Sequence, residues 1–142
     1  MIHQISAFVE NKQGRLCEIT GALAGCGINI RAFTIADTTD FGILRLIVDD
    51  PDQAVEALRA TNVTVVKTEV LAVRLVDTPG GMHKVLEALR EEGISVEYAY
   101  AFVSGKADGA YVVLRTEALP QAAQALTGRG FSLLTAVDVT GV

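Results

Sequence analysis

The chain has 142 residues, a length that suits one ordinary domain or two very small domains packed together. Hydrophobic residues make up 50% of it and charged residues 20%, which excludes a wholly disordered protein. The 12 basic and 17 acidic residues give a net charge of −5, and the basic residues do not cluster, so no nucleic-acid partner is expected. The N-terminus lacks the features of a signal peptide, and no apolar run is long enough to cross a bilayer. We therefore expect a cytoplasmic protein with no membrane partner.

The first part of the chain alternates between strand and helix patterns. Residues 4–9 alternate polar and apolar side chains, which is typical of a strand. Leu16, Ile19 and Leu23 recur at helical spacing, and the cluster Gly25-Cys26-Gly27 predicts the end of that helix.

A hairpin and a second helix follow. Residues 28–37 and 41–48 are rich in β-branched side chains and predict two strands. The turn between them, Asp37-Thr38-Thr39-Asp40, is interpreted as a solvated hairpin tip rather than a cation site. Pro51 suits a helix start, with an alanine-rich helix over residues 53–60. Residues 63–76 are long enough to form a closing strand that runs on into the next unit.

The second half repeats the first at an offset of 66 to 68 residues. Gly14 recurs as Gly80 and Gly27 as Gly93, and the strand over residues 41–48 corresponds to residues 108–115. A helical stripe (Met82, Val85, Leu86, Leu89) is followed by predicted strands over 95–103 and 110–116, a helix over 119–127 and a last strand over 132–139.

The order strand–helix–strand–strand–helix–strand therefore occurs twice, in residues 1–68 and 69–142. This order predicts an α+β fold made of two ferredoxin-like units, each an antiparallel sheet with its helices on one face. No linker rich in Gly, Pro or Ser separates the units, so we expect them to pack rigidly and to melt together.

Large side chains on the predicted strands suggest a second subunit. Phe33, Ile35, Tyr98, Tyr100 and Phe102 are too many for one helix-covered sheet face. We expect some of them to lie in a homodimer interface.

Residues that would carry out catalysis or bind a metal are sparse. Cys17 and Cys26 match no zinc or redox motif, and we expect both to be small buried side chains in a reducing compartment. His3 and His83 have no nucleophile or metal ligand near them in sequence, and no phosphate-binding loop is present. We therefore predict no enzyme activity, no metal and no cofactor.

The repeat resembles the ACT domain, a βαββαβ module of regulators of amino-acid metabolism. In the first copy the resemblance rests on residues 10–16 (Glu-Asn-Lys-Gln-Gly-Arg-Leu) and 27–30 (Gly-Ile-Asn-Ile). In the second copy it rests on residues 77–81 (Asp-Thr-Pro-Gly-Gly) and 93–96 (Gly-Ile-Ser-Val). It covers essentially the whole chain, as a tandem ACT protein without an attached enzyme.

The resemblance implies binding of a free amino acid, usually at an interface between two ACT units. A loop that ends at a helix N-terminus offers unpaired backbone N–H groups to an α-carboxylate, which is compatible with that role. The candidate ligand-binding residues are Asn11, Gly14, Arg15, Leu16, Asn29, Ile30, Asp77, Gly80, Gly81, Met82 and Ser95.

The same residues also have a purely structural interpretation. Gly14 and Gly80 suit turns, and Asn11, Asn29 and Asp77 are common turn, strand-start or cap residues. The second copy departs from the first, because Asp77 replaces Asn11 and Ser95 replaces Asn29. Two functions remain open: a sensor that binds an amino acid and regulates an unidentified enzyme, and an ACT pair that serves only in assembly.

Overall fold

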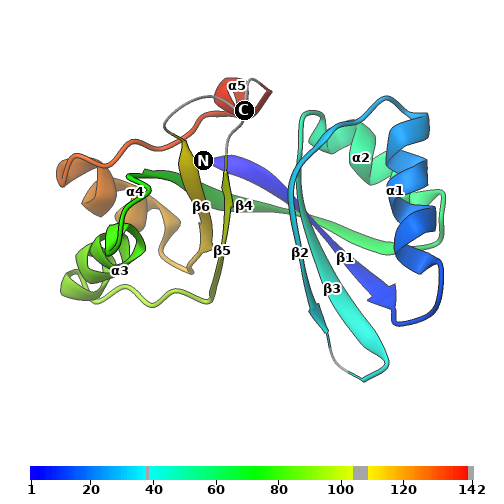
Figure 1. The fold of residues 1–142 in the computed structure, drawn as a ribbon, viewed down its shortest axis with the longest axis horizontal. Coiled ribbons are helices and arrows are strands. Elements are labelled where there is room, and N and C mark those ends of the chain that lie inside the picture. Colours follow the sequence, from blue (N-terminus) through cyan, green and yellow to red (C-terminus); the bar gives the residue numbers. More distant parts are fainter. Residues whose placement is uncertain (38, 104–108, 141–142) are drawn as a thin grey trace. The chain divides into compact units, whose positions relative to one another are not determined.

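The computed structural model describes residues 1–37, 39–103 and 109–140, and the chain divides into two compact units (Figure 1). The N-terminal unit comprises His3–Thr68, and the C-terminal unit comprises Glu69–Val142 together with Met1–Ile2. The sequence repeat predicts Met1 and Ile2 in the first unit, whereas in the structure they group with the second.

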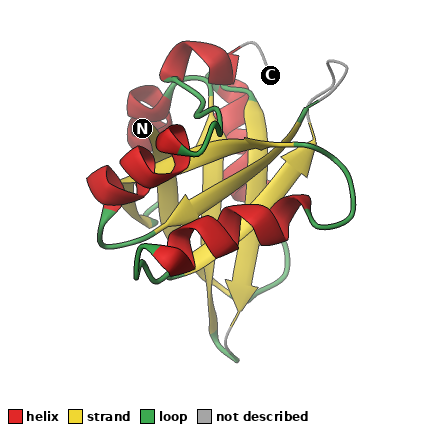
Figure 2. Ribbon diagram, turned by 90° about the vertical axis from the view of Figure 1, so that its left-hand side faces the viewer, coloured by secondary structure: helices red, strands yellow, loops and turns green. Residues whose placement is uncertain are grey.

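The N-terminal unit is a four-stranded antiparallel sheet with two helices on one face (Figure 1), and helices also lie over strands in the C-terminal unit (Figure 2). The strand order is β2-β3-β1-β4. Apolar residues that alternate along the strands meet Ile19, Leu23, Ala54 and Leu58 of the helices in one core. The elements are β1 (Ile2–Glu10), α1 (Arg15–Gly25), β2 (Ile30–Asp37), β3 (Phe41–Val48), α2 (Pro51–Arg59) and β4 (Thr64–Leu75).

The C-terminal unit begins on the second part of β4 and has the strand order β4-β6-β5. Leu71 and Val73 of β4 and Val112 and Leu114 of β6 pack with α3 and α4 in its core. Ser95 precedes the strand that was predicted to include it. The elements after β4 are α3 (Gly81–Glu91), β5 (Tyr98–Val103), β6 (Ala110–Arg115), α4 (Leu119–Gly128) and α5 (Ala136–Thr140).

The predicted last strand over residues 132–139 is wrong. Only Leu133 bridges to Val73, and the helix α5 begins at Ala136. The Thr135 amide and hydroxyl donate to Asp138 Oδ2 at 2.7 and 2.8 Å, and the Asp138 amide donates back to Thr135 Oγ1 at 3.4 Å. This reciprocal capping satisfies the first amides of a helix and so outcompetes a continued strand.

The prediction that both cysteines are buried is also wrong, because Cys17 and Cys26 are free and exposed. On α1 the buried positions are Ile19 and Leu23. Cys17 precedes Ile19 by two residues, which at 3.6 residues per turn places it on the opposite side of the helix. Cys26 is the residue that caps the C-terminal end of α1.

Of the five large side chains that suggested a homodimer, two lie on the helix-covered face of one sheet and three lie on the opposite face of the other sheet. Phe33 and Ile35 pair with Leu46 and Leu44, so they lie on the helix-covered face at the edge strand β2. Tyr98, Tyr100 and Phe102 instead pair with Arg115, Val113 and Tyr111, on the face of the other sheet that points away from α3 and α4.

Two further features bear on the predictions. Asp37, Thr39 and Asp40 of the hairpin tip are exposed, and Thr38 lies outside the described residues. Among the helices of the described residues, none is long and apolar enough to span a membrane.

Candidate ligand-binding site

The β1–α1 loop of the N-terminal unit is fastened to the tip of the β2–β3 hairpin. The Asn11 amide donates to Asp40 O at 2.8 Å, and Asn11 Nδ2 donates to Thr39 O at 3.3 Å. The Asn11 side chain therefore has a structural contact with the hairpin tip, which is a long-range contact rather than a helix cap. These bonds bring the N-terminus of α1 and the end of β2 together, although they are distant in sequence.

Gly14 forms the start of α1 with a φ of 81°, a left-handed conformation that strains any other residue. The first helical hydrogen bond runs from the Glu18 amide to Gly14 O at 3.0 Å. No side chain caps this end of α1, and among the described residues the amides of Leu16 and Cys17 have no acceptor. The helix dipole adds partial positive charge, so this end can receive a carboxylate.

A pocket of about 260 Å³ lies beside this helix end. Residues from three strands, the loop and α1 line it, so three predicted site residues besides Arg15 come together here: Asn11, Gly14 and Leu16. Its lining comprises Val9, Glu10, Asn11, Lys12, Gly14, Arg15, Leu16, Cys17, Ile35, Asp37 and Gly42.

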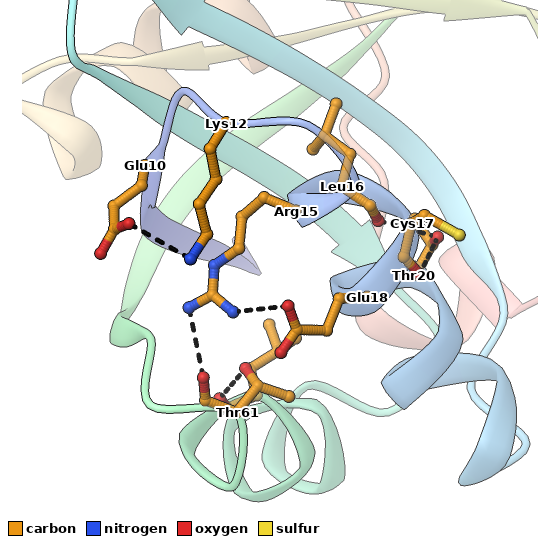
Figure 3. Close-up of polar contacts among 9 residues, drawn as sticks. Glu10, Lys12, Arg15, Leu16, Cys17, Glu18, Thr20 and Thr61 are labelled. Atoms are coloured by element: carbon orange, nitrogen blue, oxygen red, sulfur yellow. Dashed lines mark hydrogen bonds and ion pairs between the residues drawn. The ribbon is translucent and has the colours of Figure 1, made fainter.

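Arg15 borders the pocket but directs its guanidinium elsewhere. Its side chain is only 11% exposed; Nη2 donates to Thr61 O at 3.2 Å and Nη1 lies 2.9 Å from Glu18 Oε2 (Figure 3). Leu16 and Cys17 point away from these contacts (Figure 3). Arg15 therefore fastens the start of α1 to Thr61, the second residue after α2.

Asn29 and Ile30 are not brought to the pocket. They lie past the other end of α1, a helix of 11 residues and hence about 16 Å long. The Asn29 amide donates to Asp49 Oδ1 at 3.0 Å, and Ile30 packs against the core of the unit. After the glycine-rich end of α1, Asn29 lies in the connection to β2 and Ile30 is the first residue of that strand.

The matching loop of the C-terminal unit has the same backbone hydrogen bonds. The Thr78 amide donates to Val76 O at 2.8 Å and the Gly81 amide to Thr78 O at 3.0 Å, as Lys12 and Arg15 donate to Glu10 and Lys12 at 2.9 and 3.3 Å. Gly80 has a φ of 88°. A Cβ on Gly81 would lie 2.4 Å from Val76 O, so only glycine fits.

The remaining predicted residues of this unit have different surroundings. Met82 is half-buried and packs against the core, and Asp77 is exposed on the loop. Ser95 is exposed beyond the end of α3, as Asn29 is beyond α1. A groove near the ends of α3 and α4 includes Glu92, Ile94 and Arg129 and none of the predicted residues.

Sequence reasoning missed most of the pocket wall: Val9, Glu10, Lys12, Cys17, Ile35, Asp37 and Gly42. Ile35 and Asp37 are two residues apart on β2 and so lie on one face, a signal that is visible in the sequence. That this face meets the start of α1 depends on the pairing of strands and is not visible there.

The charged groups of the pocket are not all paired. Lys12 Nζ lies 3.5 Å from Glu10 Oε2, whereas among the described residues no cation pairs with the Asp37 carboxylate. Among these residues, no group of three or more His, Cys, Asp or Glu side chains gathers as metal ligands.

Comparison with known proteins decides the family. The family described as an ACT domain pair matches residues 1–139 of the chain. The chain belongs to the ACT domain pair family. The resemblance noted in the β–α loops thus extends over both α+β units of this ACT pair.

Solved structures support the assignment. This ACT pair is 40% identical to protein BT0572 from Bacteroides thetaiotaomicron, with a TM-score of 0.91 over 99% of this chain and 96% of that one. The regulatory subunit of aspartate kinase from Thermus thermophilus, in its ligand-free form, shares the fold. It has a TM-score of 0.65 and 18% identity over 89% of this chain and 90% of that chain. No curated protein matches the sequence.

Proposed function

We propose that this ACT pair is a non-catalytic regulatory protein that binds a free α-amino acid in the α1 pocket and signals to an enzyme of amino-acid metabolism. The observation that carries the proposal is the pocket beside an uncapped helix start, where the Leu16 and Cys17 amides have no acceptor among the described residues. A carboxylate at this position would accept hydrogen bonds from these two helix amides and interact with the helix dipole.

A second copy of the chain is proposed as the cover of this site. Phe33 is 64% exposed and Ile35 is 37% exposed, and both lie on the edge strand β2 beside the pocket. Edge strands and contiguous apolar surface favour association. A homodimer through this edge would enclose the ligand and link its binding to assembly.

Thermal melts with each of the 20 amino acids test the proposal. A ligand at 100 times its dissociation constant stabilises the folded state by about 2.7 kcal/mol, which raises the melting temperature by about 5 to 10 °C. A flat set of melts would contradict ligand binding.

Alkylation of the two exposed thiols locates the site. Cys17 lines the pocket, whereas Cys26 lies at the other end of α1 and serves as an internal control. The bound amino acid is expected to slow the reaction of iodoacetamide with Cys17 and to leave Cys26 unchanged. Equal rates at both thiols, with and without the ligand, would place binding elsewhere.

Asn11 separates the ligand role from the turn role. Its side chain holds the hairpin tip, so Asn11→Ala is expected to cost about 0.5 to 1 kcal/mol of stability. If Asn11 also bonds a charged group of the ligand, affinity falls roughly 10- to 150-fold. Asp77→Ala, at the matching position, is the control and is expected to leave this affinity unchanged.

Assembly alone is the second candidate, favoured by the exposure of Phe33. It predicts a stable dimer by light scattering together with flat melts. Under both hypotheses, Phe33→Ser is expected to shift the dimer toward monomer. If the protein is a sensor, the variant is expected to lose amino-acid affinity as well.

A further inference from the structure

The α1 pocket is lined by both apolar and charged residues. Its apolar lining includes the aliphatic side chains of Val9, Leu16 and Ile35, together with Cys17. The Asp37 carboxylate lies at the same end of β2 as Ile35, on the same strand face, and among the described residues it is not engaged by a cation. Such a pocket presents an anionic group, the partial positive charge of a helix start and an apolar surface.

We infer, on the basis of the proposed function, that the pocket selects amino acids with a branched aliphatic side chain, the class of valine, leucine and isoleucine, and that Asp37 binds their ammonium group. The charges of the zwitterion match the site, since Asp37 is negative and the uncapped start of α1 is positive. The side chain of the ligand then meets Val9, Cys17 and Ile35. Aliphatic carbon gains free energy from this contact, and a hydroxyl or amide there would lose its water without a partner.

The size of the pocket agrees with a single amino acid. Its volume of about 260 Å³ lies just below the roughly 300–1,000 Å³ of pockets for drug-sized ligands. Gly42 keeps it open, because it stands opposite Asp37 in the β2–β3 pairing and presents no side chain. A Cβ there would lie 3.6 Å from Ile35 Cγ2 and 3.5 Å from Ala36 O, which is ordinary contact. An added methyl group would therefore occupy pocket volume without breaking the fold.

The C-terminal unit also has an uncapped helix start, but its described edge strand has other residues at the positions of Ile35 and Asp37. By strand register, Ala99 and Ala101 occupy the positions of Phe33 and Ile35, because they pair with the core residues Leu114 and Val112. Val103 pairs with Ala110 and stands where Asp37 stands. The specificity is thus assigned to the N-terminal unit, with one ligand for each chain.

Calorimetric titration of the full chain with valine and with threonine tests the selected class. The two amino acids have nearly the same shape, so they differ by a hydroxyl in place of a methyl group. Valine is expected to bind about 10-fold more tightly, because the hydroxyl is desolvated without a partner. Each methylene from alanine upward is expected to add about 4-fold until the pocket is full. The expected stoichiometry is one ligand per chain.

Variants test the individual residues. Asp37→Asn is expected to weaken valine binding about 2- to 5-fold, the range for an exposed ion pair, whereas the matched Asp40→Asn on the same hairpin does not. Ile35→Ala, which copies Ala101, is expected to weaken leucine binding about 3- to 10-fold. Val66→Ala, at an exposed strand position outside the pocket, is its control. Gly42→Ala is expected to weaken leucine more than alanine.

The outcomes separate this inference from the proposed function. Threonine binding as tightly as valine, with protection of Cys17, would overturn the aliphatic selection and leave the sensor function intact. Equal affinities of Asp37→Asn and the unmodified chain would remove Asp37 from the site, and two ligands per chain would overturn the assignment to one unit. Absence of binding and of Cys17 protection by every amino acid would overturn both.

Discussion

The two units have the same backbone turns but place their large side chains on different faces. Each first helix starts at a left-handed glycine, Gly14 with φ 81° and Gly80 with φ 88°. Each is followed, two residues after its end, by another left-handed glycine, Gly27 or Gly93, both with φ 70°, and the next residue donates to a carbonyl in the last turn. Conformations that only glycine adopts easily are thus retained in both copies.

The edge strands carry the difference. In β2 the bulky residues Phe33 and Ile35 lie on the helix-covered face, beside a pocket. In β5 that face has Ala99 and Ala101, and the aromatic side chains lie on the opposite face, where Phe102 stacks on Tyr111 with ring centroids 5.3 Å apart. A duplicated backbone therefore supports two different surfaces, since strand side chains can change without altering main-chain hydrogen bonds.

The largest expected effect comes from matched truncations in the two cores. Leu46 and Leu114 occupy corresponding β-strand positions and are 1% and 0% exposed. Leu46→Ala and Leu114→Ala are each expected to cost about 2 to 5 kcal/mol. Because β4 belongs to both units, each variant is expected to lower one common melting transition in calorimetry. Val137→Ala, at a position 80% exposed, is the control, and two separate transitions would contradict the coupling.

A smaller effect is expected at the loop that starts α3. Gly81→Ala places a Cβ against the Val76 carbonyl and is expected to cost about 2 to 3 kcal/mol. Gly128→Ala, at the end of α4 with open space around it, is expected to gain up to about 1 kcal/mol. Chemical denaturation measures both, and equal effects at the two glycines would contradict the close approach.

Arg15 is the residue of the first unit that corresponds to Gly81, and a smaller effect is expected from its substitution. Arg15→Met removes the bond to Thr61 O and the pairing with Glu18 and is expected to cost about 1 to 2 kcal/mol. Because the guanidinium faces away from the pocket, the affinity for the amino acid is expected to stay within about 2-fold. An intact stability together with a large loss of affinity would return Arg15 to the ligand site.

The smallest expected effect concerns the pH dependence of stability at α5, the helix with which the C-terminal unit ends. The backbone amide and then the hydroxyl of Thr135 hold the pKa of the Asp138 carboxyl below its usual value. A carboxyl with a lowered folded pKa stabilises the fold above its unfolded pKa of about 3.9 and loses that stabilisation as the pH falls through the folded value. The melting temperature is therefore expected to fall slightly more on acidification than in Asp138→Asn. Identical pH profiles would remove this contribution.

Much of the architecture follows from signals along the chain. The repeat offset, the strand β3 over residues 41–48 and the stop of α1 at a glycine cluster were predictable, because alternation, helical spacing and glycine act within a few residues. The prediction of the last strand failed because a local interaction competes with it: Thr135 and Asp138 cap a helix at residues whose composition favours a strand.

Sequence by itself determined that the chain folds as two βαββαβ-like halves with special backbone turns before and after their first helices. Tertiary structure decided which side chains share a site. Asn29 is a predicted site residue, yet the length of α1 separates it from the pocket. Ile35 and Asp37 are not predicted, yet they reach the pocket through the pairing of β2 with β3. Strand register and helix packing are set by contacts between distant residues, so the wall of a pocket forms only when those contacts do.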